Sequence, residues 1–118
     1  LVEPALELAP FAWTLVWAGG TIPMPTLLSS LLPLVVGSPV LLRESAKDPT
    51  TGPLLARLLA ACDAGLAQAF VPLDLDRSDE PAQGALLTAP CLVATGSDAT
   101  ITALASRLHV RQRFVAYG

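Results

Sequence analysis

Charged and aromatic side chains are scarce in this chain of 118 residues, at 14% and 5% of the sequence. Seven Lys and Arg stand against ten Asp and Glu, so the net charge is −3, and the basic residues form no cluster. Nucleic acid is therefore excluded as an expected partner, because its recognition needs a concentrated positive surface. Any anion site must be local, built from backbone N–H groups and one or two basic side chains.

Cysteine and histidine are equally sparse. Cys62 and Cys91 lack CxxC spacing, and His109 is the single histidine. We expect both cysteines to be reduced thiols in the core, with no basic neighbour to lower their pKa, so neither is expected to act as a nucleophile. His109 is expected at the surface or at a helix end. No spacing of these residues is typical of a metal site.

Charge is missing altogether between Glu7 and Arg43, a stretch long enough to hide a transmembrane helix. Proline and glycine interrupt it, at Pro10, Gly19, Gly20, Pro23, Pro25, Pro33, Gly37 and Pro39. The apolar pieces that remain are too short to span a bilayer, so we expect no membrane span. The first residues also lack the basic start and cleavage site of a signal peptide, so we expect a cytoplasmic protein. Because the chain begins at Leu1 rather than Met, we expect residues 1–118 to be a single partial domain of a larger protein.

The sequence does contain a clear pattern of alternating predicted strands and helices. Apolar runs predict strands at residues 11–18, 39–43, 66–73, 91–94 and 111–117. Helical spacing predicts helices at 27–35, 53–62 and 81–88, and from a Ser97 or Asp98 cap to about residue 108. Pro33 is expected to end or kink the first helix. This alternation predicts an α/β fold, with a Rossmann-like, open, mostly parallel sheet and helices on both faces.

The second predicted helix, 53–62, carries the clearest apolar pattern. We expect Thr50 or Thr51 to cap it and Gly65 to close it. One apolar face is expected to contain Leu54, Leu55, Leu58, Leu59 and Cys62.

Three predicted strands end in polar or glycine-rich segments, at residues 18–23, 43–45 and 95–97. Ligands of parallel α/β sheets bind beyond the carboxyl ends of the strands, so we expect these segments to meet around one ligand. The GxGxxG fingerprint and the phosphate-binding P-loop are both absent, so neither supports a nucleotide site. The strand-to-helix segment Thr95-Gly96-Ser97 either exposes N–H groups to a phosphate or is an ordinary joint.

Four further residues have the same double interpretation. Arg43 ends the second strand, where an acidic residue suits NAD and a basic residue suits the 2′-phosphate of NADP; alternatively it pairs with Glu44 or Asp48. Ser45 either binds the same ribose or terminates the strand. Gly19 and Gly20 either let a cofactor approach the backbone or form a turn. Asp63 and Asp98 are lone carboxylates, and no catalytic set is evident.

Taken together, four segments resemble the acyl-CoA reductases of the bacterial bioluminescence type, a branch of the aldehyde dehydrogenase superfamily. They are residues 19–23, 37–43, 94–98 and 113–118, in consistent order and spacing. The resemblance covers only the cofactor-binding part of such an enzyme. It implies NADPH-dependent reduction of a fatty acyl thioester such as acyl-CoA to an aldehyde, through a cysteine-bound acyl intermediate, in a homo-oligomeric full-length enzyme.

The resemblance also assigns roles to residues. Arg43 falls where the superfamily contacts the adenosine ribose or its 2′-phosphate, Gly96 and Ser97 match a Gly-Ser beside the pyrophosphate, and Gly118 matches a glycine beside the nicotinamide. Thr21 stands where relatives have an Asn that stabilises the thioester oxyanion, so Thr21 is the candidate catalytic residue of this chain.

Two departures from the family pattern bear on the activity. Ala116 replaces the Glu that activates water in hydrolytic relatives, which favours reduction. The family's nucleophilic Cys is expected beyond residue 118, since neither cysteine of the chain matches it. Two alternatives stay open: a non-catalytic Rossmann-like assembly module, and a fragment of an NAD-linked aldehyde dehydrogenase.

Overall fold

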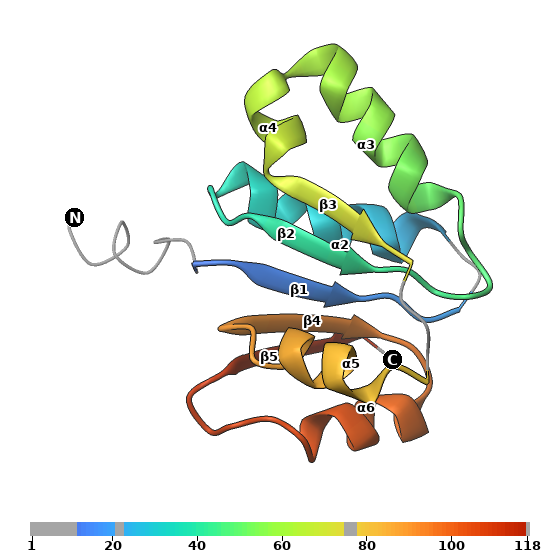
Figure 1. Ribbon diagram of the computed structural model, residues 1–118, viewed down its shortest axis with the longest axis vertical. Coiled ribbons are helices and arrows are strands. Elements are labelled where there is room, and N and C mark those ends of the chain that lie inside the picture. Colours follow the sequence, from blue (N-terminus) through green and yellow to red (C-terminus); the bar gives the residue numbers. More distant parts are fainter. Residues whose placement is uncertain (1–11, 21–22, 75–77, 118) are drawn as a thin grey trace.

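The computed structural model describes residues 12–20, 23–74 and 78–117, and centres on a sheet of five parallel strands (Figure 1). The strand order is β3-β2-β1-β4-β5. The strands are β1 Thr14–Trp17, β2 Val40–Arg43, β3 Phe70–Leu73, β4 Cys91–Thr95 and β5 Arg113–Tyr117. The predicted α/β class, with a Rossmann-like parallel sheet, is therefore confirmed.

Helices cover both faces of this sheet, as predicted. The helices are α2 Pro23–Val35, α3 Thr51–Cys62, α4 Ala64–Gln68, α5 Glu80–Leu86 and α6 Asp98–Ala105. In Figure 1, α2 lies behind the sheet and α5 lies in front of it. Among the described residues, no helix is long and apolar enough to cross a membrane.

The alternation of side chains along the strands gives the sheet two apolar layers. Val16 and Ala18 pack in one core cluster with side chains of α2 and α3, and Leu15 and Trp17 pack in the other with Leu104 of α6. All four residues of β1 are buried because β1 is the central strand and is covered on both faces. The two clusters therefore lie on opposite sides of the sheet.

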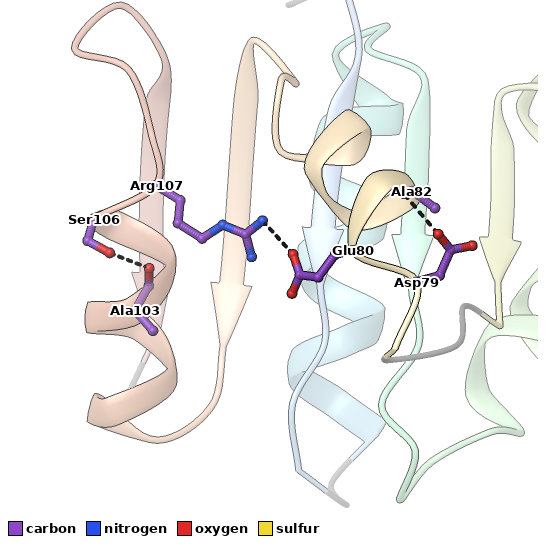
Figure 2. Close-up of polar contacts among 6 residues, drawn as sticks. All are labelled: Asp79, Glu80, Ala82, Ala103, Ser106 and Arg107. Carbon is purple, nitrogen blue, oxygen red and sulfur yellow. Dashed lines mark hydrogen bonds and ion pairs between the residues drawn. The ribbon is translucent and has the colours of Figure 1, made fainter.

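Polar contacts lie at the surface of the α5–α6 face, and one of them, an ion pair, joins the two helical regions (Figure 2). Arg107, just after α6, forms an ion pair with Glu80 of α5 at 3.2 Å, and both side chains are exposed. The Asp79 carboxylate accepts a hydrogen bond from the Ala82 N–H at 3.2 Å and so caps α5. Exposed ion pairs contribute little, about 0–1 kcal/mol, so apolar packing is the main force on this face.

The prediction for residues 66–73 was partly wrong, because the strand covers only Phe70–Leu73. A short helix, α4, precedes it, and Asp63 explains why: its carboxylate accepts from the Gly65 and Leu66 N–H groups at 2.9 and 3.3 Å. The same Asp63 ends α3, so Gly65 lies inside α4 and does not close the preceding helix.

The start of α3 also differs from the prediction. Thr50 is the N-cap residue, but its side chain makes no capping bond. The Asp48 carboxylate serves instead, accepting from the Thr51 N–H at 3.3 Å and from the Thr50 and Thr51 hydroxyls at 3.2 and 2.5 Å. These bonds hold the pKa of Asp48 below its ordinary value, with the Thr51 hydroxyl as the main cause.

Only part of the predicted apolar face of α3 is buried. Leu55 and Leu59 pack into the core, whereas Leu54, Leu58 and Cys62 are exposed. The exposed set recurs at a spacing of four residues, which places it on the outer side of the helix. Cys62 is therefore not the core thiol that the sequence predicted. In α2, Pro33 lies in the last turn, and the helix continues to Val35.

Candidate functional site

The topology of the sheet creates a crevice beside the central strand. After β1 the chain crosses to β2 through α2 on one face, and it enters β4 from α5 on the other. The carboxyl ends of β1 and β4 are neighbours, since Trp17 pairs with Ala94, and the connections that leave them diverge. This is the topological switch point at which open α/β sheets bind ligands.

A cleft of about 550 Å³ lies at this point. It is lined by Trp17, Ala18, Gly19, Gly20, Arg43, Ser45, Lys47, Gly96, Ser97 and Thr100. The lining includes every predicted cofactor residue that the structure describes, contributed by the ends of three strands. Gly118 and the candidate catalytic Thr21 lie outside the described residues.

Gly19 brings the ends of β1 and β4 together. Its N–H donates to the Thr95 hydroxyl at 3.2 Å. A Cβ at position 19 would lie 2.5 Å from the Thr95 carbonyl oxygen, so a larger residue would force the two strand ends apart. The close packing of the two backbones requires a glycine at this position. Because glycine has no side chain, only backbone atoms are exposed to the cleft here.

Gly20 and Gly96 adopt backbone angles that other residues rarely adopt. Their φ values are +93° and +148°. A Cβ at Gly20 would meet nothing within 4 Å, so this residue faces open space. Both positions present backbone without a side chain to the cleft, which suits the close approach of a ligand.

Ser97 caps the helix that leaves the cleft. Its hydroxyl accepts from the Thr100 N–H at 3.3 Å and lies 3.1 Å from the Thr100 hydroxyl. Of the two cap residues that the sequence predicted, Ser97 is the one observed, and Asp98 occupies the first turn. The amino end of α6 thus meets the cleft, with its partial positive charge and first-turn N–H groups.

Arg43 stacks on the ring of Trp17, its partner in the neighbouring strand. The guanidinium carbon lies 4.1 Å from the ring centroid, and each residue is only 6% exposed. A desolvated cation over an indole face is attracted by about 2 kcal/mol. The cation is therefore held at the end of β2, facing the cleft.

Ser45 is 4% exposed, and its hydroxyl accepts from the Lys47 N–H at 3.2 Å. Among the described residues no acceptor takes the hydroxyl proton, so Ser45 can donate a further bond. Ser45 lies two residues beyond the end of β2 and lines the cleft.

Both cysteines lie away from this cleft. Cys91 begins β4, at the opposite edge of the sheet, and Cys62 ends α3. Burial raises the pKa of the Cys91 thiol above its ordinary value, and a hydrogen bond with Thr14 and the charge of Arg113 oppose this only in part. Contrary to the sequence prediction, Cys91 therefore does have a basic neighbour, since Arg113 is its partner in β5. His109 is exposed, as predicted.

Sequence reasoning missed three lining residues: Trp17, Lys47 and Thr100. Trp17 could have been found from strand register, because it is the cross-strand partner of Arg43. Thr100 follows the cap by three residues, the spacing at which a cap bonds the first turn. Lys47 carries no local signal, since its position depends on the path of the loop after β2.

A second cavity, of about 480 Å³, is lined by Met24, Pro25, Leu28, Ser29, Leu32 and Tyr117. This apolar groove lies between α2 and the carboxyl end of β5. Within the part of the chain that the structure describes, no group of three or more His, Cys, Asp or Glu side chains could hold a metal ion. Comparisons with family profiles, curated proteins and solved structures find no match to this chain.

Proposed function

We propose that the cleft binds NADPH and that the chain is the cofactor-binding part of an enzyme that reduces a fatty acyl thioester, such as acyl-CoA, to an aldehyde. The observation that carries the proposal is the convergence of Gly19, Gly20, Arg43, Ser45, Gly96 and Ser97 on one cleft at the switch point. These residues come from three separate strand ends, and their roles follow from the resemblance to acyl-CoA reductases.

The chemistry of the cleft fits a dinucleotide. Bare glycine backbone at Gly20 and Gly96 allows a pyrophosphate to approach, and the amino end of α6 at Ser97 favours its charge. The cationic end of the cleft, at Arg43 and Ser45, suits the adenosine ribose and its phosphate. NADPH, when bound, supplies the hydride for the reduction.

The substrate side of the proposal rests on the apolar groove between α2 and Tyr117. Its lining is almost wholly apolar, which suits a fatty acyl chain. Ala116, beside Tyr117, offers no carboxylate to activate water, in keeping with reduction. Thr21 is proposed to donate a hydrogen bond to the thioester oxygen, and the nucleophilic cysteine is proposed to lie outside the 118 residues.

Substitutions of Ser97 can test coenzyme binding without removing the cap of α6. Asp and Asn cap helices as well as Ser does, so neither Ser97→Asp nor Ser97→Asn should unfold α6. Ser97→Asp places a negative charge where the pyrophosphate is proposed to lie, whereas Ser97→Asn is its neutral match. In calorimetric titrations of the chain, we expect NADPH to bind the wild type and the Asn variant and to lose at least tenfold in affinity for the Asp variant.

Absence of NADPH binding to the wild type would contradict the proposal, and so would equal binding to the Asp and Asn variants. Preference for NADH in the same titrations would support the alternative of an NAD-linked aldehyde dehydrogenase.

One observation favours a second candidate, the non-catalytic assembly module. Met24, Leu28, Leu32 and Val35 of α2 are all about half exposed or more, and they recur on the outer side of an uncharged helix. Such a surface is available to a partner subunit in an oligomer. This candidate predicts a concentration-dependent oligomer that binds neither coenzyme.

A further inference from the structure

Among the described residues, two cations and no carboxylate line the cleft at the end of β2. The cations are Arg43 and Lys47, and neither Asp nor Glu of the described ranges contributes to the lining. This local excess of positive charge contrasts with the net charge of −3 on the whole chain. The end of β2 is therefore an anion-attracting corner of a mildly acidic protein.

The acidic residues next to Lys47 in sequence are directed elsewhere. The Asp48 carboxylate is bound by the Thr51 N–H and hydroxyl at the start of α3. Glu44 extends toward the same helix, since an added Cβ at Gly52 would collide with its Oε1 atom. Both carboxylates are thus directed toward the start of α3.

Arg43 and Lys47 differ in their exposure to solvent. Arg43 is buried and held against Trp17, whereas Lys47 is exposed. Within the described ranges, no carboxylate forms an ion pair with Lys47. The loop that carries Lys47 is nevertheless fixed at Ser45, whose hydroxyl accepts from the Lys47 N–H at 3.2 Å and whose carbonyl accepts from the Asp48 N–H at 3.0 Å.

We propose that Lys47 is the residue that distinguishes NADPH from NADH, by binding the 2′-phosphate through its ammonium group. Arg43, fixed on Trp17, supports the adenosine ribose of either coenzyme and adds positive charge beside the 2′-phosphate, while Lys47 supplies the direct contact. The proposal rests on the proposed coenzyme function and adds a residue that neither the sequence pattern nor the family resemblance indicated. A phosphate dianion is a strong acceptor for a flexible ammonium group, which reaches it from an exposed loop.

The test compares coenzyme affinities of the chain and three variants. Lys47→Gln removes the charge, Lys47→Arg keeps it, and Arg57→Gln removes an exposed charge on α3 that does not line the cleft. NADPH, NADH, 2′,5′-ADP and 5′-AMP are titrated by calorimetry, and circular dichroism checks that each variant folds. We expect Lys47→Gln to weaken NADPH and 2′,5′-ADP about tenfold and to leave NADH and 5′-AMP unchanged.

Lys47→Arg is expected to restore the preference, and Arg57→Gln to leave it intact. Increasing salt should reduce the preference of the wild type more than that of Lys47→Gln, because the contact is exposed. If the wild type prefers NADPH and Lys47→Gln keeps that preference, the role of Lys47 is overturned and the proposed function stands. If the wild type binds NADPH and NADH equally, the role of Lys47 is also overturned. If it binds neither, both proposals fail.

Discussion

The Gly19 N–H donates a hydrogen bond to the Thr95 hydroxyl at 3.2 Å and so links the ends of β1 and β4. These residues are 76 positions apart in the chain. They meet because β1 and β4 are parallel neighbours in the middle of the sheet. Thr95 is buried and the bond is partly buried, and it links the two strand ends that border the cleft.

Gly19→Ala is expected to destabilise the chain. The added methyl group would lie 2.5 Å from the Thr95 carbonyl oxygen, and two backbones must separate to admit it. Overpacking of this kind costs about 1–3 kcal/mol. Gly84→Ala is the matched control, because nothing lies within 4 Å of its added Cβ, and in helix α5 it should stabilise by about 0.5–1 kcal/mol. Urea unfolding measures both changes; equal effects of the two substitutions would contradict the close approach at Gly19.

Glu44→Gln is expected to stabilise the chain at neutral pH. Burial, followed by the charges of Asp74 and Asp48, raises the pKa of Glu44 above its ordinary 4.5. Within the described part of the chain, its Oε1 atom is buried without a hydrogen-bond partner. A raised carboxyl pKa means that protonation favours the folded state, so the stabilising effect of the acid form is lost as the pH rises through the folded pKa.

The free energy of unfolding should therefore be higher for Glu44→Gln than for the wild type at neutral pH. The difference should close below about pH 4, where the wild-type side chain is protonated in both states. Urea unfolding at the two pH values checks this, and a variant less stable than the wild type at neutral pH would show that the carboxylate is stabilising.

Asp48→Ala is expected to have the opposite pH dependence. The pKa of Asp48 is lowered mainly by the Thr51 hydroxyl, so its carboxylate stabilises the fold above the ordinary pKa of 3.8 and ceases to do so as the pH falls through the lowered value. Loss of a helix cap costs about 0.5–2 kcal/mol at neutral pH. Asp48→Asn, which keeps an oxygen and removes the charge, should be intermediate. If Asp48→Ala lowered the free energy of unfolding by the same amount at acidic pH, the carboxylate could not be the source of the stabilisation.

The two cysteines are expected to react with a thiol reagent at very different rates. Cys62 is exposed at the end of α3, whereas Cys91 is buried and burial raises its pKa, so it offers little thiolate. In the native chain, the reagent should label only Cys62 quickly; after unfolding, it should label both cysteines. Peptide mass mapping locates the labelled sites. Cys62→Ser should remove the fast reaction; fast labelling of Cys91 in the native chain would contradict its burial.

The sequence predicted the sheet well because its signals are local. Short apolar runs bounded by Pro and Gly mark β1, β2 and β4, and helical spacing marks α2 and α3. The prediction failed at residues 66–68, where alanine and glutamine have no clear periodicity and the deciding contact is the Asp63 cap. It failed at Cys62 because spacing alone could not tell which side of α3 faces the sheet.

The part of the site that lies at the strand ends was predictable from the sequence. Arg43 ends β2, Ser45 lies two residues beyond it, and Gly96 and Ser97 follow β4; parallel strands must bring such segments to one edge. The loop after β2 was not predictable, because its path depends on the bonds that Ser45 and Asp48 make with the backbone. Lys47 therefore entered the site only through the structure.

The central claim is that NADPH binds in the cleft between the ends of β1, β2 and β4. An NMR titration of the isotopically labelled chain with NADPH tests it most directly, because it reports both binding and position. We expect saturable shifts of the amide signals of Gly19, Gly20, Gly96 and Ser97, with little change at Gly84 and His109 on another part of the surface. No saturable shift, or shifts confined to residues outside the cleft, would contradict the account.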